Sequence, residues 1–430
     1  MNKHGELIVF WDNYETPVGF VTKASRGRIK FRYSPEWLAK GYQFISLSLP
    51  CSPESFEPRV STNFFENFLP EGQTYLRLCK KHGLHEDDIF SFLEVFGHEC
   101  AGALSIVAPW NNSASESKYS DITDNLEELL ERHQAAEVCL MEETQARLSL
   151  AGFQNKLPVY VRDGRYFLPE EGRKPPPTTA ILKSVSKNYP GLHKNEHFCM
   201  SLARDIGLKV PATELIQIGK SQAFLVQRYD RSLQGERIIR LHQEDFCQAL
   251  GYNRLNKYQG GGGPSFAMCN DLLSNPVFKN FSSIRARFIK GVIFNYLIGN
   301  CDAHAKNFSI LYSPEGEAGL APFYDLVSTV IYKNLTNHFS MYIGRTANFY
   351  KTHELSWKIF CSDMRINVEM FSELATDVIL AVKTKKDELL SRHSEAYGDH
   401  EDYGLIQRDL NLNIESLEKI IGSSLFRAGK

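Results

Sequence analysis

The spacing of apolar residues changes once along this chain, and this change restricts the possible folds more than any other feature. Up to about Tyr229, short apolar runs of the kind that form strands alternate with turn residues and a few helical segments. From Asp230 onward, apolar residues recur mainly at helical spacing, as they do over 371–397 and 414–426. A strand-rich part followed by a helix-rich part predicts an α+β fold with two lobes. Protein kinases have this plan, and many other α+β proteins share it.

The 430 residues are enough for two or three domains. In residues 1–108, the runs ELIVFW, PVGFVTK, GRIKFRY, FISLSLP and GALSIVA predict strands of a small β-rich subdomain that also contains helices. The polar segment 111–124 marks a boundary, so residues 109–136 are expected to form a linker and a short helix. Residues 137–229 would then form a strand-rich N-lobe, and residues 230–430 a helical C-lobe.

Composition narrows the classes of protein to consider. With 43% hydrophobic and 23% charged residues, the chain has the profile of a folded, soluble protein. No apolar run approaches a membrane span, and the N-terminal apolar stretch is too short for a signal peptide, so we expect a cytoplasmic protein without membrane contacts. The nine cysteines are never spaced C-x-x-C and are expected to be reduced. A net charge of -2 disfavours independent binding to nucleic acid.

A polar loop directly after a predicted helix contains the residues that carry the chemistry. The helix IRARFIKGVIFNYLIG can end at Gly299, and the loop NCDAHAKN follows it at once. Four polar side chains lie within this loop: Asp302, His304, Lys306 and Asn307.

Two strand-like runs, FSILY and LAPFY, follow the loop, and the second leads directly into Asp325. If they pair as a hairpin centred near Gly316, Asn307 and Asp325 lie opposite one another, each nine residues from the centre. Cross-strand partners have Cβ atoms about 5 Å apart, so both side-chain oxygens could reach one magnesium ion. The hairpin therefore predicts a site for Mg2+.

The order Asp-x-x-x-x-Asn, hairpin, Asp matches the arrangement of a protein kinase, with Asp302 placed to receive the substrate hydroxyl. A lysine for the phosphates of ATP is expected on the strand TAILKSV, at Lys183, with Glu196 of the next helix as its orienting partner. The strand end from Gln227 to Tyr229 is expected to be the hinge between the lobes, where backbone groups could recognise adenine.

Several runs, in order, resemble the HipA-like family of serine/threonine kinase toxins. They are LSLAGFQNKLPVYV, AILKSV, NEHFCMSLARDIGLKVP, LVQRYDR, LHQEDFCQALG, YLIGNCDAHAKNFSIL and LAPFYDLVS, and FFENFLPEG resembles the N-terminal subdomain of that family. The resemblance covers about residues 147–330 and 64–72. Departures from the family pattern occur at Asn155, Gln227 and Ala303.

The resemblance implies that Asp302 is catalytic, that Asn307 and Asp325 bind magnesium, and that Lys183 contacts ATP. It also implies that 149–156 is a phosphate-binding loop. Further nucleotide contacts are expected at Ala151, Gly152, Phe153, Gln154, Asn155, Lys156, Gln227, Arg228, Tyr229, Asp230, His304 and Lys306.

The resemblance further implies regulation and partners. Ser149 would be autophosphorylated, which would switch the kinase off. A small HipB-like helix-turn-helix antitoxin would be the partner, and operator DNA would be bound through that complex. The protein substrate would be a translation factor such as an aminoacyl-tRNA synthetase.

Other interpretations stay open at this point. A metal-dependent phosphoester hydrolase would use Asp302, His304 and Asp325 as metal ligands, and a catalytically silent corepressor would keep only the kinase fold. His193 and His197 lie four residues apart, but without a third ligand they favour two histidines on a helix surface. The run Gly260–Gly263 is expected to be a flexible loop that faces the substrate or joins the lobes, not a phosphate loop.

Overall fold

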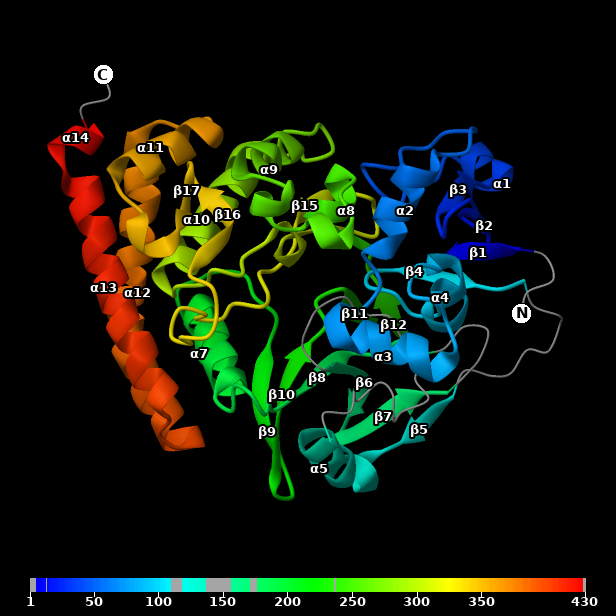
Figure 1. Ribbon diagram of the computed structural model, residues 1–430, viewed down its shortest axis with the longest axis horizontal. Helices are drawn as coiled ribbons and strands as arrows, with labels where there is room; N and C mark the ends of the chain where they lie inside the picture. Colours follow the sequence, from blue (N-terminus) through cyan, green and yellow to red (C-terminus); the bar gives the residue numbers. More distant parts are fainter. Residues whose placement is uncertain are drawn as a thin grey trace. The chain divides into compact units, whose positions relative to one another are not determined.

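The computed structural model describes residues 5–12, 14–109, 118–136, 156–170, 176–235 and 237–427, and the chain folds into two compact units (Figure 1). The first unit comprises Met1–Lys187, Ile216–Arg254 and Leu311–Gly316, and the second comprises Asn188–Leu215, Leu255–Ile310 and Glu317–Lys430. The division therefore differs from the expected boundary after Tyr229. The segment from Asp230 to Arg254 folds with the first unit, because its arginines bond to the N-terminal residues.

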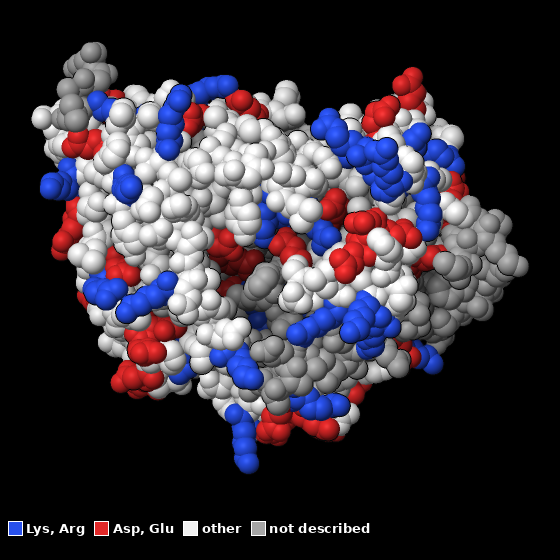
Figure 2. Space-filling model, in the orientation of Figure 1, with Lys and Arg blue, Asp and Glu red and all other residues white. Residues whose placement is uncertain are grey.

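The surface carries charges of both signs. On the face shown in Figure 2, basic and acidic side chains intermingle, in keeping with the net charge of -2. Across the described ranges, no helix combines the length and the apolar character of a membrane-spanning segment.

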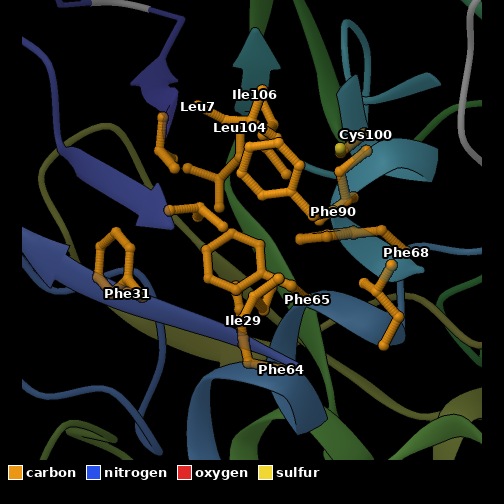
Figure 3. Close-up of a cluster of buried hydrophobic side chains, with 14 of the residues drawn as sticks. Leu7, Ile29, Phe31, Phe64, Phe65, Phe68, Phe90, Cys100, Leu104 and Ile106 are labelled. Atoms are coloured by element: carbon orange, nitrogen blue, oxygen red, sulfur yellow. The ribbon is translucent and has the colours of Figure 1, made fainter. Parts of the chain in front are cut away.

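The N-terminal sheet of the first unit is antiparallel, in the order β3-β2-β1-β4. Alternate side chains of β3, from Ile29 to Tyr33, are buried, as expected for a strand with one face on a core. The core contains many aromatic side chains, including Phe31, Phe64 and Phe65 (Figure 3). The elements of this subdomain are β1 (Glu6–Trp11), β2 (Gly19–Lys23), β3 (Ile29–Tyr33), β4 (Leu104–Val107), α1 (Pro35–Ala39), α2 (Pro58–Glu66), α3 (Gly72–His82) and α4 (Ile89–Phe96).

The run FISLSLP does not form the predicted strand. Only an isolated bridge between Ser46 and Leu49 is present. A side chain takes the place of a partner strand, because the carboxylate of Glu244 accepts hydrogen bonds from Ser46 Oγ at 2.5 Å and from Leu47 N at 3.1 Å. This segment is therefore held by a buried carboxylate 197 residues further along the chain, which periodicity cannot reveal.

A second sheet of six strands has the order β5-β7-β6-β8-β10-β9. The predicted hairpin is confirmed, because Asp163 and Gly164 both have positive φ, at 49° and 73°, as a tight turn between twisted strands requires. The strands are β5 (Tyr119–Asp121), β6 (Lys156–Arg162), β7 (Arg165–Pro169), β8 (Ala180–Ser184), β9 (Thr213–Ile218) and β10 (Ser221–Gln227), and α5 (Leu126–Ala136) packs against them. The unit also contains β11 (Arg231–Gln234), β12 (Arg237–Arg240), β13 (Gln243–Asp245) and α8 (Phe246–Leu250).

The second unit consists mainly of helices. The long helix over 371–397 is confirmed, whereas the last long helix begins at Glu401 and not near Ile414. Its helices are α7 (Leu192–Asp205), α9 (Phe266–Leu273), α10 (Phe281–Leu297), α11 (Glu354–Asp363), α12 (Val368–Tyr397), α13 (Glu401–Gly422) and α14 (Ser424–Arg427). Its strands are β15 (Ala318–Leu320), β16 (His338–Ile343) and β17 (Thr346–Asn348). Along the chain, β14 (Ser309–Tyr312) begins in the second unit and ends in the first. The eight described cysteines are free thiols, as predicted, and seven of them are buried.

Two histidines of α7 are buried, which corrects the interpretation that His193 and His197 lie on a helix surface. Their exposed fractions are 6% and 4%. His197 Nδ1 lies 3.1 Å from Nε2 of His393, at hydrogen-bond distance. His393 lies on α12, which packs against α7, so the partner of His197 comes from a helix 196 residues further along the chain.

Acid is expected to destabilise the second unit through this histidine pair. Burial lowers the pKa of His197 to about 3, with His393 and Arg204 adding to the effect, and burial lowers the pKa of His393 to about 4. Both values lie below the pKa of about 6.5 of an unfolded histidine, so the pair stabilises the fold above that pH, and this stability is lost as the pH falls toward the folded values. The loss approaches about 1.4 kcal/mol per pH unit for each histidine.

Urea unfolding of the second unit, measured between pH 7 and pH 5, tests this expectation. The variant His393→Gln should show about half the pH dependence of the wild type, because one of the two histidines is gone. His338→Gln is a matched control, since that side chain is exposed in the same unit. Equal slopes for wild type and His393→Gln would contradict the assignment.

Candidate active site

The loop after α10 is held by one buried asparagine, Asn300, which sequence analysis did not single out. Its Oδ1 accepts a hydrogen bond from Asp302 N at 3.0 Å, and its Nδ2 donates to Asn295 Oδ1 at 2.8 Å and to Asp325 O at 3.3 Å. A single side chain therefore joins the end of α10 to the backbone of both predicted site aspartates. Gly299, with φ of 69°, ends the helix as predicted.

The carboxylate of Asp302 is exposed and faces two hydroxyl groups. Its Oδ1 accepts a hydrogen bond from Tyr258 Oη at 3.2 Å, and Ser340 Oγ lies 3.4 Å away. Ser340 is tied in turn to the Cys301 carbonyl through its Oγ, at 2.8 Å. An accessible carboxylate in a hydrogen-bonded setting can receive the hydrogen bond of a substrate hydroxyl.

Asn307 and Asp325 do not face each other across a hairpin, which corrects the predicted geometry. Ala321 N donates to Ser309 O at 2.8 Å, but the next residue, Pro322, has no N–H with which to continue the ladder. On the other side, Asn307 belongs to a short 3-10 turn, Ala305–Asn307, and not to β14.

The two segments nevertheless meet through Tyr324. Its hydroxyl donates to Lys306 O at 2.7 Å and lies 2.6 Å from Ser309 Oγ. These bonds connect the residue before Asp325 to the residue before Asn307. The two segments that carry the predicted pair are thus joined by a tyrosine and by Asn300, and not by strand pairing.

Asp325 has a backbone conformation that few residues adopt. Its φ is 52°, in the left-handed region, where aspartate is tolerated better than most residues. Such conformations persist where the surrounding structure enforces them and are common at functional sites. Asn307 is also oriented, because its Nδ2 donates to the Asp302 carbonyl at 3.0 Å.

The side chains of Asn307 and Asp325 fit a magnesium ion better than a metal held by protein alone. Carboxylate and amide oxygens are hard ligands, and Mg2+ in kinases takes one or two of them together with phosphates and water. No group of three histidine, cysteine, aspartate or glutamate side chains within the described residues could hold a metal. The described residues therefore offer no set of ligands for the zinc ion of a hydrolase.

His304 is buried beside two lysines, Lys257 and Lys306, which are themselves only 8% and 6% exposed. Burial lowers the pKa of His304 well below its ordinary value, and the charges of Lys257 and Lys306 lower it further, against the opposing effect of Asp325. The imidazole is therefore neutral and suited to a structural role. Lys257 was missed by the sequence analysis because nothing in its local pattern separates it from a surface lysine.

The expected phosphate-binding lysine lies in the first unit, on β8. Lys183 is 7% exposed and lies directly opposite Lys156, the first residue of β6. Lys183 Nζ also lies 5.8 Å from the ring centre of Phe224, its neighbour on β10.

The expected hinge residues take part in a buried ion network. Arg228 Nη1 lies 3.2 Å from Glu99 Oε1, and Arg228 donates to both carboxylate oxygens of Asp230, at 3.0 and 2.9 Å. Arg231 also contacts Glu99, at 2.6 Å. The side chains of Arg228 and Asp230 thus brace the strand end, and the predicted contact with adenine would fall to backbone groups.

Several predicted site residues lie outside the described part of the chain: Ser149, Ala151, Gly152, Phe153, Gln154 and Asn155. Gln227 is exposed at the end of β10, and Tyr229 donates a hydrogen bond to Gln243. Glu196 is buried in the second unit, whereas Lys183 belongs to the first, so their pairing stays a prediction. Gly260–Gly263 is not the flexible loop that was predicted, because the N–H groups of Gly261 and Gly263 both donate to Tyr258 O.

Comparison with known proteins identifies relatives over almost the whole chain. The HipA N-terminal domain matches residues 7–107, and the HipA-like C-terminal domain matches residues 148–386. The candidate kinase Y4mE of Sinorhizobium fredii is 33% identical over 403 residues, which are 91% of this chain and 94% of that protein. The serine/threonine-protein kinase toxin HipA of Shewanella oneidensis is 30% identical over 325 residues, 72% of each chain.

A solved structure has the same fold. A chain in the complex of HipA, HipB and operator DNA from the Shewanella oneidensis MR-1 toxin–antitoxin system gives a TM-score of 0.82 and covers 99% of this chain and 100% of that chain. The identity is 22%, so the likeness concerns the fold. It confirms the predicted mixed α+β architecture of a kinase-like protein.

Proposed function

Because this chain belongs to the HipA-like family, we propose that it is an ATP-dependent serine/threonine protein kinase of the toxin type. The observation that supports the proposal is that Asn300 and Tyr324 join, within the second unit, the backbone segments that carry Asp302, Asn307 and Asp325. Their order and chemistry match the catalytic Asp, metal-binding Asn and metal-binding Asp of protein kinases.

Each residue has a distinct task in this proposal. Asp302 accepts the hydrogen bond of a serine or threonine hydroxyl and directs its oxygen toward the γ-phosphorus. Asn307 and Asp325 hold Mg2+, which when bound neutralises charge on the β- and γ-phosphates. Lys183 and Lys156, which are paired in register on β8 and β6, contact the phosphates from the first unit. The buried ammonium group of Lys306 adds positive charge next to Asn307.

The partners are proposed from the relatives. The solved complex named above holds HipA, HipB and operator DNA, which supports a HipB-like helix-turn-helix antitoxin for this chain and contact with an operator through that complex. The net charge of -2 provides no overall attraction to DNA, which favours DNA binding through a partner over binding by this chain alone. The substrate is proposed to be a translation-related protein, such as an aminoacyl-tRNA synthetase.

Labelling of a cell extract with radioactive ATP tests the proposal. Purified wild-type protein with Mg2+ should transfer phosphate to serine or threonine of a small number of proteins, which phosphosite mapping identifies. Release of inorganic phosphate from phosphate esters with a transition metal, without transfer to protein, would instead support the hydrolase. Tight antitoxin and operator binding with neither reaction would support the silent corepressor.

Autophosphorylation of Ser149 is expected to weaken ATP binding at least about tenfold, because a phosphate adds about -1.5 to -2 charges beside the phosphates of ATP. Transfer between two copies is favoured, since a serine in the phosphate loop reaches its own Asp302 only with difficulty. Mass spectrometry of active protein should find phosphate on Ser149. The unmodified Asp302→Ala protein provides the comparison in ATP titrations, and equal affinities would contradict the inhibitory role.

A further inference from the structure

The loop from Leu255 to Gly263 reaches the active site and is firmly held. Tyr342 N donates to the side chain of Gln259 at 2.8 Å, and Asn256 Nδ2 donates to Gly261 O at 2.9 Å. The N–H groups of Gly261 and Gly263 both donate to Tyr258 O at 3.0 Å. A Cβ on Gly263 would lie 2.3 Å from Asn256 O and 2.8 Å from Tyr258 O, so the turn closes this tightly only with glycine there.

This loop places Tyr258 against two residues of the catalytic loop. Its ring meets that of His304 edge to face, with centroids 5.5 Å apart, and its hydroxyl donates to Asp302 Oδ1 at 3.2 Å. The ammonium of Lys257 lies 5.1 Å from the centre of the same ring. The ring itself remains 41% exposed, beside the accessible carboxylate of Asp302. Tyr258 is therefore fixed by packing while it borders the place where a substrate hydroxyl arrives.

We propose that Tyr258 is a positioning residue that holds the Asp302 carboxylate in the orientation required to receive the substrate hydroxyl; this inference rests on the proposed kinase function. Phosphoryl transfer depends mainly on placement, and an exposed carboxylate would otherwise sample several rotamers. The Tyr258 hydroxyl donates to Oδ1 and restricts the rotation of the carboxylate, whereas Ser340 Oγ, 3.4 Å from the same oxygen, donates to the Cys301 carbonyl at 2.8 Å. Tyr258 does not contact the nucleotide in this role.

The variant Tyr258→Phe tests the role, because it keeps the ring on His304 and removes only the hydroxyl. A hydrogen bond to a charged group that is worth 1.5–3 kcal/mol corresponds to a loss in kcat of about 10- to 160-fold, with the lower figure expected here because the Asp302 side chain is exposed to water. The KM for ATP should not change, since the interaction concerns the acceptor side. The measurement is the initial rate of radioactive transfer into the same cell extract at several ATP concentrations.

Two further variants sharpen the test. Tyr350→Phe removes the hydroxyl of another exposed tyrosine of the second unit and should match the wild type. Ser340→Ala removes a hydroxyl whose proton is donated to the Cys301 carbonyl at 2.8 Å, so it should lower kcat less than Tyr258→Phe does.

The outcomes separate this inference from the proposed function. Wild-type protein without any transfer would overturn both. Active wild type with inactive Asp302→Ala, but with Tyr258→Phe as fast as or faster than wild type, would overturn the positioning role alone. A raised KM for ATP or a lowered melting temperature in Tyr258→Phe would also overturn it, since either result would indicate a general structural role.

Discussion

Replacing Asp302 with alanine is expected to slow phosphoryl transfer by about 1000-fold, within the range observed for loss of a positioned acid-base group. The side chain is exposed and lies at the start of the catalytic loop, where its carboxylate can meet a substrate hydroxyl. The loop itself is held by the side chain of Asn300 through the backbone N of Asp302, a bond that alanine retains. The variant should therefore stay folded and should bind ATP.

Loss of the Asp325 carboxylate is expected to have an equally large effect for a different reason. Asparagine is the sharper substitution here, because φ of 52° is tolerated by aspartate and asparagine but is unfavourable for alanine. Asp325→Asn removes the charged metal ligand and keeps the shape of the turn. The Mg2+ concentration that gives half of the maximal remaining rate should rise in Asp325→Asn, whereas in Asp302→Ala it should not change.

The control for both variants is Asp377→Ala, which removes an exposed aspartate paired with Lys290 on the surface of the second unit. Its transfer rate should equal that of the wild type. Either site variant retaining near wild-type transfer, at an unchanged melting temperature, would show that the roles are wrongly assigned. If the wild type is toxic on expression, that toxicity should disappear in both site variants.

The polar residues of the loop after α10 stand out in the sequence because they are close together and follow a clear helix end, and their catalytic role stays a prediction. The hairpin geometry used to bring Asn307 near Asp325 was wrong, since Pro322 ends the ladder and Tyr324 provides the connection. A hydrogen bond from a tyrosine side chain to a backbone carbonyl cannot be predicted from the spacing of apolar residues in the sequence. The sequence therefore gives the order of the predicted site residues, but not the contacts that join their segments.

Residues whose role depends on distant partners could not be predicted. Tyr258 lies 44 residues from Asp302, and Glu99 lies 129 residues from Arg228. In each case a single residue looks like an ordinary surface residue until the fold supplies its partner. The same holds for His197, whose partner is on a helix near the other end of the chain.

Glu99→Ala is expected to destabilise the first unit by about 3–5 kcal/mol, the cost of leaving buried charges without their partner. Glu99 is 1% exposed and lies at 3.2 Å from Arg228 and 2.6 Å from Arg231. Burial alone would raise the pKa of Glu99, yet the charges of Arg228, Arg231 and Arg240 hold it below its ordinary value. The carboxylate is thus ionised and compensates arginines that have almost no access to water.

The loss of stability in Glu99→Ala should exceed that caused by a cavity of the same size, because the buried arginines then outnumber the buried carboxylates. Without Glu99, Asp230 is left to compensate both Arg228 and Arg231, and Thr178 loses the acceptor of its backbone N–H, at 3.1 Å, and of its hydroxyl. These residues connect the N-terminal subdomain to the strand end after β10. Loosening them should also weaken ATP binding, if the backbone there recognises adenine.

Urea unfolding with hydrogen exchange of β4 and β10 measures the effect in the first unit. Glu99→Gln, which keeps the volume of the side chain, should lose most of the same stability, because an amide cannot replace the charge that two arginines require. Glu6→Ala removes a partly exposed partner of Arg32 in the same unit and should change stability little. Wild-type stability in Glu99→Gln would show that the charge of Glu99 is dispensable and that packing alone holds this part of the unit.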